Sequence, residues 1–239
     1  MIKNNIKYIW MQFRANKRIL VWGMVISFLV ISLSLFLCET ERRVSFSEIT
    51  AREVPYAIYG AGYIFLLLYI VIILAASNYW YFKDETYTYE IYYGKNWASV
   101  FSRILCQAGT YIGIFTIEMV LAGILFGNIL ELYFWKNLFI IALFSFAIAE
   151  ITITFIWVTK NIVISAIVVS LYFLMVGSLL PTKQISGIIA PDLAFYLWAL
   201  NKNSPSVLIA MASLFFYAAI SCLILLLMEA SNKRRKNEK

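Results

Sequence analysis

Six apolar stretches, each long enough to cross a lipid bilayer, constrain this chain more than any other feature of its sequence. A helix needs about 20 mostly apolar residues to span the hydrocarbon core. Such stretches occupy residues 19–38, 56–82, 104–130, 138–159, 162–180 and 207–228. The composition agrees, since 62% of the residues are hydrophobic and 14% are charged, against about 45–50% and about 25% in soluble domains. We therefore expect an all-α, polytopic membrane protein with six transmembrane helices within residues 19–232.

The basic residues predict which ends of these helices face the cytoplasm. Lysine and arginine are enriched in cytoplasmic loops. With both termini inside, 14 of the 20 basic residues lie on the inner side, including a basic tail at residues 233–239. The net charge of +7 then reflects topology and attraction to anionic headgroups. We expect both termini to be cytoplasmic, and we expect no nucleic-acid partner.

The first 18 residues have the pattern of an amphipathic helix that lies on the membrane surface. Ile2, Ile6, Ile9 and Phe13 follow one another at helical spacing and share one face. Basic side chains occupy a neighbouring arc: Lys3, Lys7, Arg14 and Arg18. Residues 1–18 are therefore predicted to form an interfacial helix at the inner leaflet, and a solvated basic leader is the alternative.

Several kinds of chemistry are excluded by what the sequence lacks. There is no histidine, so a Ser-His-Asp triad or an HExxH zinc site is impossible. The three cysteines, Cys38, Cys106 and Cys222, have no metal-binding spacing. Gly94-Lys95 lacks the remainder of a Walker A motif. We therefore expect no enzymatic activity, no catalytic residue, no metal and no cofactor on this chain.

Two connecting segments differ from ordinary loops. The inner loop after the second span carries mixed charges and many aromatic residues, which is typical of a protein-binding surface, although an aromatic belt would also explain part of it. The outer segment before the last span, residues 185–200, is too apolar for a surface loop and too short to cross the membrane. Pro181 ends the preceding span. The segment itself contains the helix-interrupting residues Gly187 and Pro191 and one acid, Asp192. A re-entrant or broken helical segment is predicted there, with an interfacial shelf as the alternative.

Two carboxylates lie inside predicted spans, Glu118 in the third and Glu150 in the fourth. An ionisable group at membrane depth is costly and is a functional candidate by default. A local role is the alternative, because Glu150 could hydrogen-bond with Thr152 or Thr154. The third span also carries Gly109, Gly113, Gly123 and Gly127 in two small-xxx-small pairs, a spacing that lets helices approach closely.

Together these features resemble the permease subunit of a bacterial ABC exporter of the type-2 permease family. The resemblance covers the whole layout, including the short loop between spans four and five. The closest local match is Phe82-Lys83-Asp84-Glu85, similar to the Phe-x-x-Glu start of that family's coupling helix, with Arg103 at the basic position that opens span three. Tyr89-Glu90 stands where the family commonly has Gly-Thr, so the register of the coupling helix stays open.

The resemblance implies that the transport pathway and the ATP-binding site belong to different chains. A separate ABC ATPase subunit would bind ATP and Mg²⁺ and would contact this chain in the bacterial plasma membrane. The implied coupling residues are Lys83, Asp84, Glu85, Thr86, Tyr87, Thr88, Tyr89 and Glu90. Two permease chains, as a homodimer or less favourably a heterodimer, would enclose the pathway among the membrane lipids. The implied cargo is an amphipathic or antimicrobial peptide, exported from a Gram-positive cell or removed in self-immunity.

Two other functions fit the sequence less well. The first is a proton-coupled secondary carrier that uses Glu118 and Glu150 as a relay without any ATPase. Such carriers often contain inverted repeats, and we find none in this chain. The second is a membrane enzyme or scaffold, for which no catalytic constellation is present.

Overall fold

The computed structural model describes Arg18, Val21, Trp22, Val25, Phe28 and Leu29, and residues 97–125, 129–130, 132–179, 188–189 and 207–237. Four long helices form this part: α6 (Trp97–Leu125), α7 (Leu132–Thr159), α8 (Ile162–Leu179) and α11 (Val207–Asn237). Apart from short turns and connections, the described residues are helical. An all-α fold is therefore confirmed for this part of the chain.

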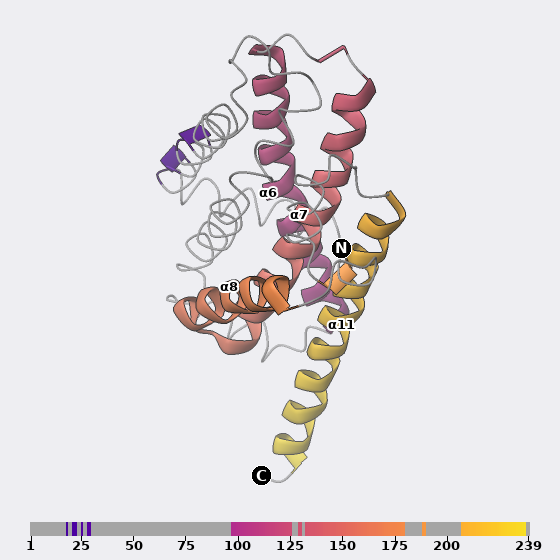
Figure 1. The fold of residues 1–239 in the computed structure, drawn as a ribbon. Coiled ribbons are helices and arrows are strands. Elements are labelled where there is room, and N and C mark those ends of the chain that lie inside the picture. Colours follow the sequence, from indigo (N-terminus) through magenta and orange to yellow (C-terminus); the bar gives the residue numbers. More distant parts are fainter. Residues whose placement is uncertain are drawn as a thin grey trace.

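Helix α7 is the centre of the bundle. It contacts α6, α8 and α11, and Figure 1 shows it between α6 and α11. Its buried side chains lie around the helix instead of along one stripe, from Phe134 and Phe144 to Ile153 and Trp157. A helix that is apolar all round is typical of a protein core or a membrane span.

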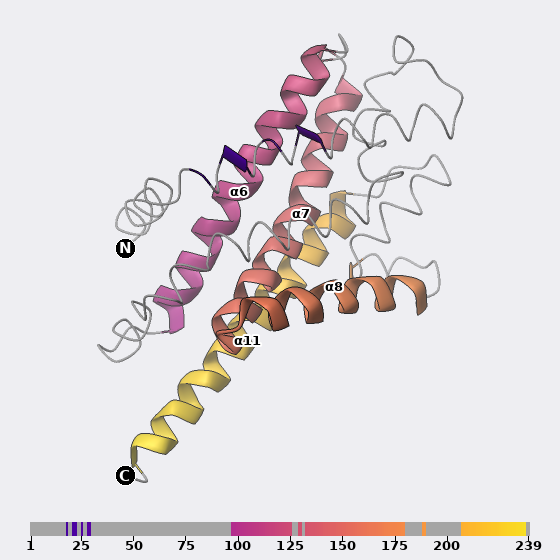
Figure 2. The ribbon, with the colours of Figure 1, turned by 90° about the vertical axis from the view of Figure 1, so that its left-hand side faces the viewer.

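The directions of the helices follow from the close contacts between them. A methyl group at Gly109 would touch the ring of Phe146, and one at Gly123 would overlap the ring of Phe134, so α6 and α7 run antiparallel. Figures 1 and 2 show α11 running in the same direction as α7. The start of α6, the end of α7 and the carboxyl end of α11 therefore lie at the same end of the bundle.

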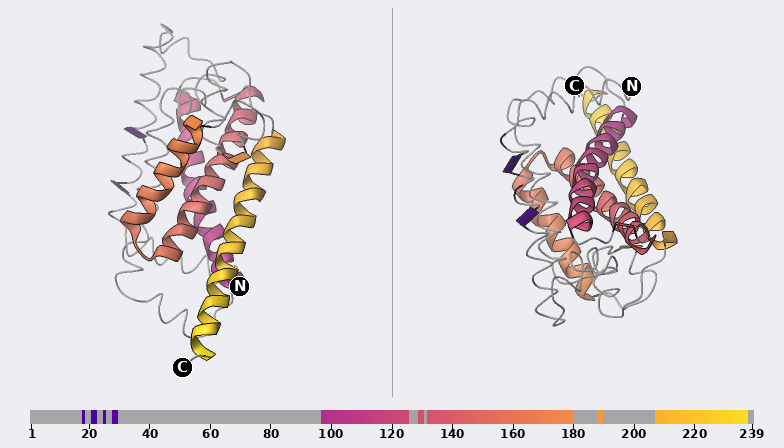
Figure 3. Two further views of the ribbon diagram at one scale, coloured as in Figure 1. Left: turned by 60° about the horizontal axis from the view of Figure 1, so that its bottom comes forward. Right: turned by 90° about the horizontal axis from the view of Figure 1, so that it is seen from above.

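Helix α8 begins where the fifth apolar stretch was predicted to begin, but it lies crosswise to α7 and α11 in two perpendicular views (Figures 1 and 2). The view from above in Figure 3 shows it extending away from the crossing of the other helices. Many of its apolar side chains are exposed, among them Val163, Ile164 and Leu171. Its assignment as a membrane crossing stays a prediction.

Among the described residues, two helices are long and apolar enough to cross a membrane, with spans at Phe134–Thr159 in α7 and Val207–Ser231 in α11. Within these spans α7 is mostly buried in the bundle, whereas only a few residues of α11 are buried. Large apolar side chains cover the exposed face of α11, including Leu208, Phe215 and Leu227. Soluble proteins rarely expose apolar surface of this kind to water. In a membrane the lipid tails would cover these side chains. These helices favour a membrane location, and the remaining four spans stay predictions.

Candidate functional site

The seam between α7 and α11 combines small, polar and charged side chains. Helix α11 contributes a buried stripe at intervals of three and four residues: Ala210, Ser213, Tyr217, Ser221 and Leu225. From α7, Thr154 lies 3.0 Å from Ser221 and is hydrogen-bonded to it, and both side chains are fully buried. Small and hydroxyl-bearing residues are typical of contacts between membrane helices, because they let the backbones approach and can bond across the interface.

Glu150 lies on α7 one helical turn before Thr154 and is fully buried. Within the described part of the chain, neither of its carboxylate oxygens has a hydrogen-bond partner. The thiol of Cys222 on α11 lies within electrostatic range of this carboxylate, which places Glu150 at the seam. Burying a carboxylate with neither a counter-charge nor a hydrogen bond costs several kcal/mol or more, so this is the most unusual group among the described residues.

The neighbouring threonines do not relieve that cost. The hydroxyl of Thr152 donates to the main-chain oxygen of Ile148 at 2.7 Å. The hydroxyl of Thr154 lies 2.9 Å from the main-chain oxygen of Glu150 and bonds to it. Such bonds to the preceding turn are common for threonine in helices. Thr154 therefore bonds to the main chain of Glu150, and neither threonine hydroxyl bonds to the Glu150 carboxylate, which was the local alternative for this side chain.

Glu150 lies deep within α7. It precedes Thr159, the end of the helix, by nine residues, which is about 14 Å along the axis. The hydrocarbon core is about 30 Å thick, so a helix that crosses it along its length would hold Glu150 near mid-depth. That depth is the setting in which a carboxylate is a functional candidate.

Glu118 lies elsewhere in the bundle. The antiparallel contacts of Gly109 with Phe146 and Gly123 with Phe134 place Glu118 level with residues 137–139 of α7, about 18 Å along the axis from Glu150. Its side chain is half-buried and has an interaction partner. The two carboxylates therefore form no single site.

Asn137 on α7 lies level with Glu118 along the bundle axis and was not predicted as a site residue. It is 1% exposed, and within the described residues neither its amide nitrogen nor its oxygen has a hydrogen-bond partner. The predicted fourth span began at residue 138, one position too late to include it. The sequence feature that could have identified Asn137 is a polar residue within the first turns of an apolar helix.

Hydroxyl groups of α8 and α11 hold Ile188 and Ile189, two residues of the segment that precedes α11. Ser213 donates to the main-chain oxygen of Ile188 at 3.0 Å, and Tyr217 donates to that of Ile189. Tyr172 also reaches the oxygen of Ile189, at 3.4 Å. Ten residues separate Tyr217 from Val207, the start of α11, so Ile189 is held about 15 Å along that helix. Pro181, Gly187, Pro191 and Asp192 lie outside the described residues.

The connection between α7 and α8 is short and well capped. Lys160 adopts a left-handed conformation with φ of 55°, and the side-chain oxygen of Asn161 accepts hydrogen bonds from the amides of Val163 and Ile164. The hydroxyls of Thr159 and Ser165 bond to each other across the turn. Asn161 thus caps α8, and the connection between α7 and α8 is only two residues long, as short as the sequence predicted.

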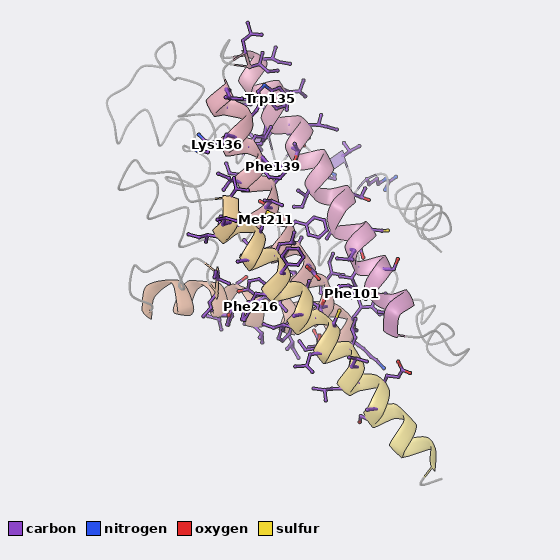
Figure 4. All side chains as sticks on the ribbon, turned by 90° about the vertical axis from the view of Figure 1, so that its right-hand side faces the viewer. Phe101, Trp135, Lys136, Phe139, Met211 and Phe216 are labelled. Atoms are coloured by element: carbon purple, nitrogen blue, oxygen red, sulfur yellow. The ribbon has the colours of Figure 1, made fainter. Side chains whose placement is uncertain are left out.

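Apolar side chains of α7 and α11 cover one outer face of the bundle. Figure 4 shows Trp135, Phe139, Met211 and Phe216 on this face, and each is between 36% and 53% exposed. Lys136 lies beside Trp135 at the start of α7 and is exposed. Tryptophan and lysine near the end of an apolar helix are typical anchors at the membrane–water boundary.

The other predicted features lie mainly outside the described residues. These are the interfacial helix at 1–18 except Arg18, the spans at 19–38 and 56–82, and the coupling residues from Lys83 to Glu90. The described chain resumes at Trp97, seven residues after Glu90, where α6 begins. In the described part, no group of three or more Cys, Asp or Glu side chains could hold a metal ion.

No protein-family model, curated protein or solved structure matches this chain.

Proposed function

We propose that this chain is the membrane subunit of an ATP-driven exporter of the ABC type, powered by a separate ATPase subunit. The observation that carries the proposal is the inner segment from Lys83 to Glu90, which places charged and aromatic side chains between two apolar spans. That composition is typical of a protein-binding surface, and the chain has no nucleotide-binding motif of its own.

The arrangement of the bundle supports this proposal. The coupling segment leads within seven residues into α6, whose start lies at the same end of the bundle as the end of α7 (Figure 2). A force applied to this segment would therefore act directly on α6 and, through its close contacts, on the central α7. Movement of rigid helices against one another is a common way to open and close a pathway.

Two chains of this kind, identical or related, would enclose the pathway in the bacterial plasma membrane. An amphipathic peptide is the cargo that best matches the long apolar and aromatic spans. The separation of Glu118 from Glu150 by about 18 Å disfavours the alternative, a carrier in which the two carboxylates exchange a proton directly.

The variant Glu85→Lys tests the proposed coupling contact. We expect an ATPase subunit to co-purify with the wild-type chain from its native membrane and to be lost with Glu85→Lys, because a basic residue would replace an acidic contact. The control is Glu229→Lys, a charge reversal of the same kind near the carboxyl end of α11, which should retain the ATPase. Equal ATPase recovery with both variants would contradict the assigned contact.

A further inference from the structure

The seam between α7 and α11 contains a carboxyl group for which the described structure supplies no compensation. Glu150 is fully buried, both of its carboxylate oxygens lack hydrogen-bond partners there, and the adjacent hydroxyls of Thr152 and Thr154 bond to main-chain oxygens. A carboxylate in such surroundings does not stay charged on its own. Either a proton or another cation must neutralise it.

We propose that Glu150 is the binding site for the positive group of a cationic amphiphile, an ammonium or guanidinium group, when α11 moves away from α7. This inference rests on the proposed transport function and names the chemical class of the cargo. In the closed seam the carboxyl group holds a proton. When the cation enters, the O–H bond breaks, the carboxylate pairs with the cation and the proton leaves to water, so one positive charge replaces another.

The packing of α11 makes this helix the moving element. It contacts α7 and α6, and its buried side chains follow one stripe that contains Ser213, Tyr217 and Ser221. In lipid the hydrophobic effect does not hold helices together, so such a seam depends on van der Waals packing and hydrogen bonds. Helix α7 is fixed by contacts with three helices. Opening the seam therefore exposes Glu150 while α7 keeps its contacts with α6 and α8.

The residues around Glu150 favour an organic cation over a metal ion. Calcium takes six to eight oxygen ligands, usually from several carboxylates, whereas the groups described near Glu150 are one carboxylate, the hydroxyls of Thr154 and Ser221 and the thiol of Cys222. On the same face of α7 as Glu150, three residues to either side, Ala147 and Ile153 are buried. A single charge next to apolar side chains matches an amphiphile that carries one cationic group and a hydrocarbon part.

Infrared difference spectroscopy on the full chain in lipid nanodiscs tests the proposal, with decylammonium as the probe and decanol as its uncharged control. We expect a carbonyl band of a protonated carboxyl group that is present in the wild type and absent in Glu150→Gln. Decylammonium should remove this band, and decanol should not. Its affinity should fall about tenfold in Glu150→Gln, as expected for the loss of one charged pair, and should be partly retained in Glu150→Asp.

Two further variants serve as controls. Glu118→Gln removes a carboxyl group at the other level of the bundle and should leave both the Glu150 band and the affinity unchanged. Arg103→Gln tests whether Arg103, whose side chain lies outside the described part, supplies a counter-charge. If it did, the wild type would lack the band and Arg103→Gln would create it, and the proposal would be wrong.

The proposal is also overturned if decylammonium binds wild type and Glu150→Gln equally, or if it leaves the Glu150 band in place. No ATPase or nucleotide enters this experiment, so its outcome is separate from that of the proposed function. Binding at Glu150 by a chain that associates with no ATPase would preserve this inference and refute the exporter assignment. An associated ATPase with an unresponsive band would do the opposite.

Discussion

Thr154 on α7 and Ser221 on α11 are hydrogen-bonded to each other, with 3.0 Å between their hydroxyl oxygens, one helical turn from the buried Glu150. This contact joins the central helix of the bundle to α11, which has large exposed apolar side chains. It lies among small side chains, and it marks the place where the two helices separate if the bundle opens.

The first prediction concerns the energy of this contact. Bonds between membrane helices contribute about 0.6 kcal/mol on average and at most about 1.7 kcal/mol. We expect Thr154→Val and Ser221→Ala each to lower the free energy of unfolding. The loss in the double variant should be smaller than the sum of the two single losses, and the difference should equal that coupling energy. A double-mutant cycle of unfolding by sodium dodecyl sulfate measures the coupling, and strictly additive losses would mean that the two hydroxyls do not interact.

The second prediction tests the close approach of α6 and α7. A methyl group at Gly123 would come within 2.5 Å of the Phe134 ring, which is fully buried, whereas one at Gly113 would meet nothing within 4 Å. Gly123→Ala should therefore destabilise the chain by about 1–3 kcal/mol, the usual cost of overpacking, and Phe134→Leu should restore part of that loss. Gly113→Ala is the matched control, and an equal loss of stability in both variants would contradict the packing described.

A third prediction addresses the turn between α7 and α8. Asn161 accepts hydrogen bonds from Val163 and Ile164, so Asn161→Ala should cost about 1 kcal/mol, the typical value of an N-cap. Asn161→Asp keeps the accepting oxygen and should retain most of the stability. The same unfolding titration measures both variants, and the capping role fails if aspartate is no better than alanine.

A fourth prediction tests the topology. Lys136 and Lys160 stand at opposite ends of α7 and both are exposed. In a background in which Cys38, Cys106 and Cys222 are replaced by serine, a membrane-impermeant maleimide should label Lys136→Cys on intact cells. It should label Lys160→Cys only after permeabilisation. The reverse pattern would invert the topology, and labelling of both positions on intact cells would mean that α7 does not cross the membrane.

The positions of the four described helices could be predicted largely from hydropathy, because apolar length decides where a chain can span a membrane. The predicted starts at residues 162 and 207 agree with α8 and α11. The ends of other helices differ for physical reasons. Helix α6 starts at Trp97 because polar residues such as Ser102 are compatible with a helix, and α11 continues to Asn237 because lysine and arginine are favourable at a helix carboxyl end.

The site was only partly predictable. Glu150 stands out in the sequence as an acid in an apolar run, but its lack of a partner depends on which helices surround it. Ser213, Tyr217 and Ser221 recur every fourth residue and could have been recognised as one helix face. Their partners, Ile188, Ile189 and Thr154, come from other elements, and spacing along one helix carries no information about them.

The measurement that tests the central claim most directly is transport in liposomes. The chain is reconstituted either alone or with the ATPase that co-purifies with it, and accumulation of a fluorescent cationic amphipathic peptide is followed with ATP or with a proton gradient. We predict accumulation against the gradient only when the ATPase and ATP are both present, and its loss in Glu85→Lys. Accumulation by the chain alone, driven by the proton gradient, would contradict the account.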